Sequence, residues 1–563
     1  MRREASVVNK KVCSFPILFA LLALLIGTCA VVFPASAQAA PTSTGSITVS
    51  GTVASSYDAY QIFSANVVDG DSDAKIATAL AWASDAVRDA ALPVLHSAGM
   101  PNSQTTAQEA AEWLNTDSHL TSALSAQLAR SLQSSGAVFV ALNAGTAAEL
   151  PCGYWFIVAK DDAIAQGEAG TAPIMALAGG SAVTVKPKAA TPKVSKHVLE
   201  DGTAAWQKAA DATVADDLYW RLSATVPAGL TAYDTYTVRF VDTMSAGLDP
   251  SKVAASMRVY VAAGADGGFD AVSAGKDGRA GTEPAQGWTD ITAQCATKVA
   301  ADGKTFTVRT GDLIAALGGT EAFTAGARVV AVYNAPLNSA CNHGIAKGNS
   351  NEVYLRYPRS PLADQSGDAG FTRTPSDDAC AYTWDLALTK RGSDGDKPLA
   401  GAVLSIADDR GRTLAADGTW DAEGKATVTT GEDGRVAVSG VDSGKLEVRE
   451  LKAPKGYTAF EGTRSATVKA EGLDVDQVAA AKPKLTITAE SPLRADSADG
   501  STGSLEASLI NTPTGTPPSI TTGGFMPSTG DMAMYAAAAA AVAGAALIVV
   551  ALLVKRGGGS HKE

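Results

Sequence analysis

Residues 382–390 read Tyr-Thr-Trp-Asp-Leu-Ala-Leu-Thr-Lys, and they open the part of the chain whose fold is plainest. Short apolar stretches follow, and clusters of turn-forming residues separate them. Three such clusters lie at residues 392–395, 416–418 and 431–434. Their Gly and Asp residues tolerate the backbone angles of tight turns. The pattern predicts a β-sandwich over residues 381–513, with a loop insertion over residues 459–484.

The preceding part of the chain, residues 188–361, predicts another β-sandwich. Its strand candidates are apolar stretches at residues 235–242, 256–262, 305–309, 328–333 and 352–357. Residues 264–287 are rich in Gly and Asp, and they predict a long surface loop.

The part of the chain before these, residues 40–187, mixes two kinds of pattern. Residues 74–98 and 106–133 are rich in Ala with spaced Leu, Val and Trp, and they predict helices. Residues 138–142 and 153–158 predict buried strands. The predicted fold class is therefore mainly β: tandem immunoglobulin-like β-sandwiches preceded by an α+β N-terminal domain.

Both ends carry targeting patterns. Residues 1–39 have a basic start, an apolar run and small residues before a cleavage site, and they predict a secretory signal peptide. Residues 533–554 carry no charge and are long enough to span a bilayer. The basic tail after them predicts a cytoplasmic end. Residues 514–525, rich in Thr, Pro and Gly, predict a linker.

A short motif stands just before the predicted span, where residues 525–531 read Phe-Met-Pro-Ser-Thr-Gly-Asp. With the span and the tail, residues 526–563 resemble the cell-wall sorting signal of Gram-positive surface proteins. In that family a sortase cuts between Thr and Gly. This implies cleavage between Thr529 and Gly530, with Pro527 as the proline of the motif. Met526 stands where the family usually has Leu, and its similar volume and flexibility suit the same site.

Residues 381–513 carry further motifs in the order typical of the B-type repeat domain of collagen adhesins and pilins. They read Leu-Glu-Val-Arg-Glu at 446–450 and Ser-Leu-Ile-Asn-Thr-Pro at 508–513. The resemblance implies an intramolecular isopeptide bond between Lys390 and Asn511, assisted by a buried Glu450. Burial lowers the pKa of a Lys and raises that of a Glu, so a neutral amine can attack the amide while the acid shuttles protons.

Residues 188–361 resemble the A-type domain of the same families. The stretches that carry the resemblance begin at Pro192, Val238 and Gly348. They imply a cross-link from Lys196 to Asn351, with Asp242 as the proton shuttle. Asn334 is the competing acceptor. Asn351 is preferred because it opens the strand that we expect beside Lys196.

Residues 184–188 read Thr-Val-Lys-Pro-Lys and resemble the pilin motif of backbone pilins. In that family the Lys amine resolves the sortase acyl-enzyme of the next subunit. Lys188 is the implied nucleophile, and Thr529 of a neighbouring subunit is its partner. Lys186 stands where the family has an aromatic residue. Lys186 and Lys193 therefore remain alternative linkage sites, and an ordinary basic linker remains an alternative reading.

Four Cys residues remain in the predicted mature chain, and a secreted context permits disulfides. Cys295 and Cys341 lie in one predicted domain and are the expected pair, whereas a Cys152–Cys380 bond would cross domains. Residues 69–73 read Asp-Gly-Asp-Ser-Asp and hint at a Ca²⁺ loop, but Ala74 and Leu80 stand where such a loop needs Gly and a terminal Glu, so a solvated turn is the better reading. No paired-Cys or paired-His motif occurs. We predict no metal site and no cofactor.

The 563 residues carry a net charge of −12, which argues against nucleic acid as a partner. The resemblance covers nearly the whole chain and implies a structural backbone subunit of a sortase-assembled fimbria on a Gram-positive surface. Implied partners are pilin-type and housekeeping sortases, identical subunits, minor or tip pilins and peptidoglycan; no host ligand is indicated. The alternative is a singly anchored adhesin or minor pilin. A surface hydrolase is disfavoured because no catalytic triad or carboxylate pair stands out.

Overall fold

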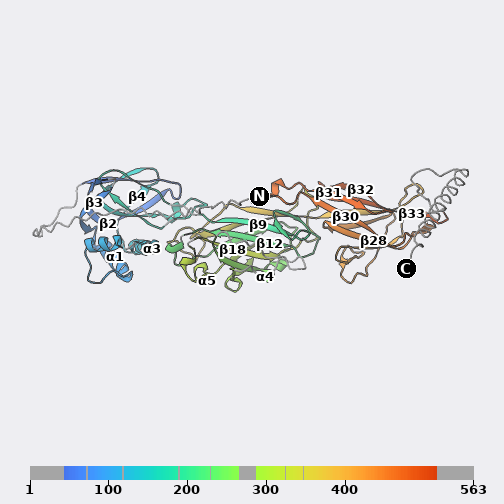
Figure 1. Ribbon diagram of the computed structural model, residues 1–563, viewed down its shortest axis with the longest axis horizontal. Helices are drawn as coiled ribbons and strands as arrows, with labels where there is room; N and C mark the ends of the chain where they lie inside the picture. Colours follow the sequence, from blue (N-terminus) through green and yellow to red (C-terminus); the bar gives the residue numbers. More distant parts are fainter. Residues whose placement is uncertain are drawn as a thin grey trace, which may run out of the picture.

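Three groups of β-sheets follow one another along the long axis of the molecule (Figure 1). The computed structural model describes residues 43–71, 74–116, 119–170, 172–187, 191–228, 230–264, 287–323, 325–346 and 348–515. Most of these residues that have regular structure lie in strands, and the predicted fold class is confirmed. The predicted signal peptide, sorting motif and span lie outside these residues. Within the described part, no helix is both long and apolar enough to cross a membrane.

The N-terminal group combines two sheets with helices. The larger sheet contains β3 (Lys75–Trp82), β2 (Ser56–Asp69), β6 (Gly153–Ala159) and β7 (Ile174–Ala178), with β4 (Phe139–Asn143) also paired to β2. The smaller sheet contains β5 (Ala147–Pro151), β1 (Thr44–Val49) and β8 (Val183–Val185). The helices are α1 (Asp85–Ser97), α2 (Ala107–Asn115), α3 (Ser122–Ser134) and the 3-10 turn η2 (Asp161–Ala163). Apolar side chains of α1, α2 and α3 share a core with β2 and β6.

The predicted helix over residues 74–98 is wrong in its first half. Residues 75–82 form β3 instead, because pairing with β2 satisfies their backbone groups and overrides the helix propensity of Ala. The helix α1 begins only after Ser84, whose side chain accepts a hydrogen bond from the Val87 amide. The predicted strand at residues 138–142 forms as β4, but Val138 and Phe139 are 86% and 46% exposed rather than buried.

The central group is a β-sandwich. One sheet contains β10 (Ala205–Gln207), β9 (Lys193–Glu200), β12 (Tyr219–Val226), β18 (Ala327–Asn334), β14 (Arg258–Ala263) and β15 (Thr289–Asp290). The facing sheet contains β11 (Ala209–Asp211), β21 (Asp377–Tyr382), β19 (Asn349–Pro358), β13 (Arg239–Met244), β17 (Thr305–Arg309) and β16 (Ala296–Val299), with β20 (Phe371–Arg373) paired to β19. The short helices are α4 (Val253–Ser256), α5 (Leu313–Ala316), η3 (Leu230–Ala232), η4 (Pro250–Lys252), η6 (Thr292–Gln294) and η7 (Thr320–Phe323). Fully buried side chains from both sheets, including Trp220 and Phe240, fill one core.

The C-terminal group is another sandwich. One sheet contains β27 (Arg435–Val441), β22 (Trp384–Gly392), β33 (Ser504–Pro513) and β29 (Tyr457–Thr458), with β32 (Leu493–Asp499) paired to β33. The facing sheet contains β25 (Trp420–Asp421), β24 (Thr413–Leu414), β23 (Val403–Ala407), β28 (Gly444–Lys452), β30 (Thr463–Glu471) and β31 (Lys484–Ala489), with β26 (Val428–Thr429) paired to β23. A 3-10 turn, η8, spans Val478–Ala480. The predicted loop insertion over residues 459–484 is wrong in part, because β30 lies within it.

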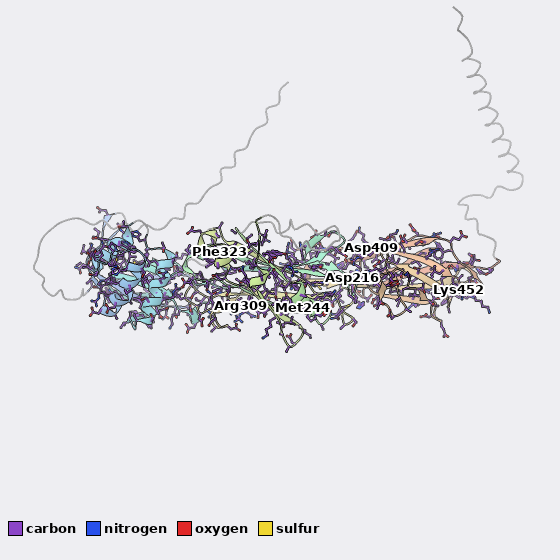
Figure 2. All side chains as sticks on the ribbon, turned by 90° about the horizontal axis from the view of Figure 1, so that it is seen from below. Asp216, Met244, Arg309, Phe323, Asp409 and Lys452 are labelled. Carbon is purple, nitrogen blue, oxygen red and sulfur yellow. The ribbon has the colours of Figure 1, made fainter. Side chains whose placement is uncertain are left out.

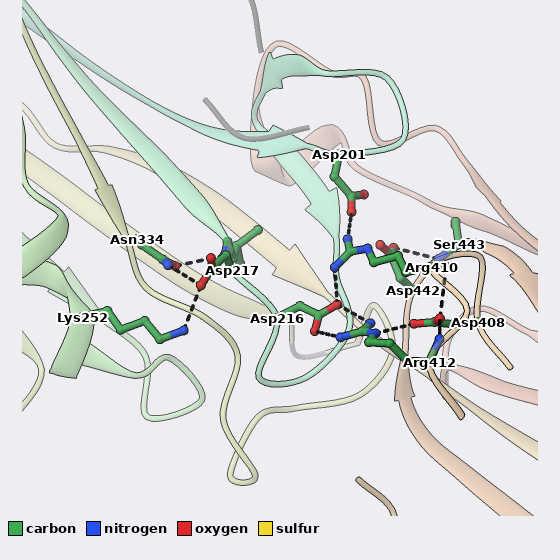
Figure 3. A network of polar contacts seen from close by, with 11 residues as sticks. Asp201, Asp216, Asp217, Lys252, Asn334, Asp408, Arg410, Arg412, Asp442 and Ser443 are labelled. Carbon is green, nitrogen blue, oxygen red and sulfur yellow. Dashed lines mark hydrogen bonds and ion pairs between the residues drawn. The ribbon is translucent and has the colours of Figure 1, made fainter. Parts of the chain in front are cut away.

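The central and C-terminal groups meet through an almost continuous strand and a charged network. The strand β21 ends at Tyr382, and β22 begins two residues later. Across this junction Arg412 Nη2 lies 2.7 Å from Asp216 Oδ2, and Arg410 Nη2 lies 2.7 Å from Asp201 Oδ2 (Figure 3). These ion pairs join residues of the two sandwiches.

Candidate functional site

In the C-terminal group, strand pairing brings Lys390 and Asn511 together. The strands β22 and β33 run parallel, with Lys390 opposite Leu509 and Gly392 opposite Asn511. Because side chains alternate between the faces of a sheet, Lys390 and Asn511 project to the same side. The prediction that the first and last strands lie side by side is confirmed. Glu450 reaches this pair from β28 in the facing sheet.

The three side chains contact one another in the interior. The Lys390 Nζ donates to the Asn511 Oδ1 and lies 3.1 Å from the Glu450 Oε1. The Asn511 Nδ2 donates to both Glu450 oxygens, at 2.9 and 3.0 Å. Lys390, Glu450 and Asn511 are only 0%, 7% and 2% exposed. An amine, an amide and a carboxyl group are therefore in position to react with one another away from water.

Burial also changes the charge of the amine. It lowers the pKa of Lys390 from 10.5 to about 8, although the nearby Glu450 carboxylate acts in the opposite direction. The Phe460 ring lies 5.7 Å from the Lys390 Nζ and helps to keep water out. A substantial fraction of the lysine is therefore neutral near pH 8, which is the form that can act as a nucleophile.

In the central group the corresponding residues come from both sheets. Lys196 lies on β9, whereas Asp242 and Asn351 lie on β13 and β19 of the facing sheet. The Asn351 strand, β19, contacts β9 as expected, but it pairs with β13 and β21 rather than with β9. The side chains nevertheless meet, since they point into the same core from opposite sides.

Tyr333 links the three predicted residues. The Lys196 Nζ donates to the Asp242 carboxylate and, at 2.9 Å, to the Tyr333 hydroxyl. That hydroxyl donates to the Asp242 Oδ2 at 3.1 Å and accepts from the Asn351 Nδ2 at 2.9 Å. All four side chains are fully buried. The sequence analysis missed Tyr333, although it lies directly before Asn334 in a predicted strand.

Burial acts on both charged partners of this cluster. It lowers the pKa of Lys196 to about 8 and raises the pKa of Asp242. Both shifts favour the neutral forms, a free amine and a protonated acid. In addition, the Asp242 Oδ1 and the Asn351 Oδ1 are buried without a hydrogen-bond partner among the described residues. Buried oxygens without a hydrogen bond cost free energy in the folded state.

The competing acceptor, Asn334, is held elsewhere. Its Oδ1 accepts from the Leu218 amide at 3.0 Å, and its Nδ2 donates to the Asp217 carboxylate at 2.6 Å, as Figure 3 shows for Asp217. The Tyr333 hydroxyl contacts Asn351, whereas Asn334, the last residue of β18, bonds to Leu218 and Asp217.

A second buried lysine fixes the backbone of Lys196. The Lys208 Nζ donates to the Lys196 carbonyl at 2.8 Å, and the Lys196 amide donates to the Asp377 carboxylate at 2.6 Å. Lys208 and Asp377 also form an ion pair with each other. At this residue β9 pairs with Leu222 of β12, and Lys208 and Asp377 bond to the Lys196 carbonyl and amide in addition.

The predicted polymerisation residues are only partly within the described structure. Lys188 lies outside it, and so do Met526, Pro527, Thr529 and Gly530. The two alternative linkage residues, Lys186 and Lys193, are both exposed. Both therefore meet the first requirement for a linkage site, access from solvent.

The predicted disulfide is wrong. The described Cys residues are all free: Cys152, Cys295, Cys341 and Cys380. Cys295 precedes β16, near Arg309, whereas Cys341 packs against Gly247, beyond the far end of β13. Figure 2 shows Arg309 and Met244, the last residue of β13, at separate points along the molecule. A disulfide needs Cα atoms about 4.4–6.8 Å apart, so residues at opposite ends of a strand cannot form one.

Comparisons with known proteins agree with this architecture. Residues 385–482 match the family described as the SpaA prealbumin-like fold domain. A stretch of 143 residues, 24% of this chain, is 29% identical to the trypsin-resistant surface T6 protein of Streptococcus pyogenes serotype M6. That match spans 24% of the length of this curated relative. The predicted resemblance to backbone pilins is thereby confirmed.

Several solved structures are also similar. The T6 backbone pilin of serotype M6 Streptococcus pyogenes gives a TM-score of 0.46 at 17% identity, covering 85% of this chain and 100% of that chain. The major pilin SpaD of Corynebacterium diphtheriae gives a TM-score of 0.41 at 15% identity, covering 84% of this chain and 98% of that chain. The major pilin SpaA of the same organism gives a TM-score of 0.39 at 14% identity, covering 83% of this chain and 100% of that chain.

Proposed function

We propose that this chain is the backbone subunit of a covalent fimbria on the surface of a Gram-positive bacterium. In this proposal each subunit cross-links itself internally, and a sortase joins Lys188 of one subunit to Thr529 of the next. The subunit comprises domains at residues 40–187, 188–361 and 381–513, and a wall-anchoring signal at residues 526–563. Its contribution to adhesion is mechanical, and its partners are sortases, minor or tip pilins and peptidoglycan.

The observation that carries the proposal is the contact of Lys390, Glu450 and Asn511 in the interior of the C-terminal sandwich. The neutral Lys390 amine attacks the side-chain carbonyl carbon of Asn511, and a new C–N bond forms. Glu450 accepts a proton from the amine and delivers it to the Asn511 nitrogen, which leaves as ammonia when the old C–N bond breaks. The product is an amide between two neighbouring strands.

The same reaction is proposed for the central group. There Lys196 is the nucleophile, Asn351 the acceptor and Asp242 the proton shuttle. The Tyr333 hydroxyl, which contacts all three side chains, orients the acceptor toward the amine.

Intact mass and peptide mapping of residues 40–525 test the internal cross-links. We expect the loss of two ammonia molecules, with Lys196 joined to Asn351 and Lys390 joined to Asn511. The variant Glu450→Gln should retain one of the two losses, because it leaves the central site untouched. A mass without any ammonia loss would overturn this part of the proposal.

Sortase-catalysed polymerisation of the same protein, extended to its C-terminus, tests the linkage. We expect a ladder of high-mass species that disappears in Lys188→Ala and persists in Lys186→Ala and Lys193→Ala. A wall-anchored monomer without any ladder would instead favour the singly anchored adhesin or minor pilin.

A further inference from the structure

Four arginines form a ladder across one sheet of the central sandwich. Arg239 on β13 stands directly opposite Arg309 on β17 and Arg356 on β19. Arg356 in turn stands opposite Arg373 on β20. Side chains of directly opposed residues lie on the same face about 4.5–5.5 Å apart at Cβ, where like charges destabilise the sheet.

This ladder has little counter-charge within the described structure. Asp368 forms its ion pairs, with Arg356 at 3.0 Å and with Arg239. No ion pair joins Arg309 or Arg373 to a described carboxylate. Burial and the charges of Arg309 and Arg356 lower the pKa of Arg239, although Asp368 acts in the opposite direction. A positive excess therefore persists here on an otherwise acidic chain.

One end of the ladder lines a pocket of about 350 Å³ between the central group and Ile164 and Gln166 of the N-terminal group. Three arginines are among the residues that line it: Arg356, Arg359 and Arg373.

Arg359 is hydrogen-bonded to backbone carbonyls, and the Asp161 carboxyl group is near enough to interact with its charge. Its Nη1 donates to the Asp161 carbonyl at 3.0 Å and its Nη2 donates to the Phe371 carbonyl at 3.3 Å. Its Nε is buried without a hydrogen-bond partner among the described residues. The Arg373 guanidinium lies over the Tyr354 ring, 5.1 Å from its centroid, and remains exposed on its other side.

We propose that this pocket binds an oxyanion, a carboxylate or a sulfate, carried by a small molecule such as an acidic sugar. A planar guanidinium offers paired N–H donors that match the two oxygens of such a group. The repulsion within the ladder is relieved when the anion binds, so binding is favoured beyond the contacts themselves. The site is separate from both lysine clusters, and it does not depend on the proposed cross-linking.

The test is a titration of the full secreted chain at low ionic strength, because salt screens such binding. The probes are inorganic sulfate, N-acetylneuraminic acid and glucosamine 6-sulfate. We expect saturable binding of at least one probe, weakened at least tenfold in Arg373→Ala. Asp368→Asn should bind several-fold more tightly, because it frees Arg356 from its carboxylate. Arg494→Ala, which removes an exposed ion pair in the C-terminal group, is the matched control and should bind normally.

Tighter binding of a sugar than of sulfate would assign the anion to a glycan, and equal binding would assign it to a free oxyanion. Both results support the site. If the folded parent chain, checked by its cooperative thermal unfolding, shows no saturable binding of any probe, the proposal is overturned. Equal affinity in the parent chain and in Arg373→Ala would overturn it as well.

Discussion

The two lysine clusters each contain an amine, an acid and an amide, but the clusters differ in which two of these groups share a sheet. In the C-terminal group Lys390 and Asn511 share one sheet, and Glu450 comes from the facing sheet. In the central group the acid and the amide share one sheet, and Lys196 faces them from the other. The amine contacts the amide directly in the first cluster, whereas Tyr333 lies between them in the second.

This difference shows which features the proposed chemistry depends on. Strand order and sheet membership vary between the clusters, but burial and the lowered lysine pKa are common to both. What the fold must supply is a dry interior in which an amine, an acid and an amide meet. The position of each on the sheets is secondary.

Removal of either acceptor is the change with the largest expected effect. Asn511→Ala and Asn351→Ala should each lower the free energy of unfolding by about 5 kcal/mol, because a cross-link that closes a loop of more than 100 residues restricts the unfolded chain. Chemical denaturation and peptide mapping measure the loss. Asn334→Ala is the control and should keep the Lys196 cross-link. If it loses that cross-link while Asn351→Ala keeps it, the acceptor is Asn334.

The protonation of the lysine gives a pH-dependent prediction for the unlinked C-terminal group. In Asn511→Ala, folded Lys390 releases its proton near pH 8, whereas the unfolded chain holds it up to about 10.5. Between these values the unfolded state binds more protons, so stability should rise with pH. Between about pH 8 and pH 10.5 the free energy of unfolding of Asn511→Ala should rise by about 3 kcal/mol relative to that of Asn511→Ala/Lys390→Met, as measured by urea denaturation. A difference that stays constant from pH 7 to pH 10 would contradict the lowered pKa.

Tyr333→Phe should slow cross-linking in the central cluster and leave cross-linking in the C-terminal cluster unchanged. It removes the hydroxyl that contacts Lys196, Asp242 and Asn351, so we expect the central cross-link to form about tenfold more slowly, a barrier increase of about 1.4 kcal/mol. The C-terminal cross-link, which has no such intermediary, should form at its normal rate and serves as the internal control. Mass spectrometry of freshly synthesised protein follows both reactions. Equal rates in Tyr333→Phe and the parent chain would reduce Tyr333 to a packing residue.

The smallest expected effect concerns the Lys208–Asp377 pair. Lys208→Met keeps most of the side-chain volume but removes the donor that holds the Lys196 carbonyl. We expect the central cross-link to form a few-fold more slowly in the same assay, with the C-terminal cross-link unchanged. Lys193→Met, at an exposed position on β9, the strand of Lys196, is the matched control. A similar slowing in both variants would show that the effect is not specific to Lys208.

The sequence predicted the clusters better than their surroundings. Lys390, Glu450 and Asn511 were found because ordered motifs identify them, and the structure brings them together. Tyr333 and Lys208 were missed because their roles depend on which sheet faces which, and periodicity along one strand does not contain that information. The disulfide prediction failed for the same reason, since sharing a predicted domain says nothing about the end of a strand at which a Cys lies. The Ala-rich residues 75–82 formed a strand because pairing with β2 outweighed local propensity.

The short passage from β21 into β22 has a consequence for the length of the molecule under tension. With both proposed cross-links in place, the shortest covalent route from Lys188 to Thr529 passes through Lys196, Asn351, Lys390 and Asn511. It contains about 65 residues, or roughly 220 Å at full extension, whereas the uncross-linked chain could lengthen to about 1,150 Å. Because this route crosses the central–C-terminal junction along strands that are already extended, a pulled subunit has little slack there to release. The fimbria would then behave as an almost inextensible tether rather than as a spring.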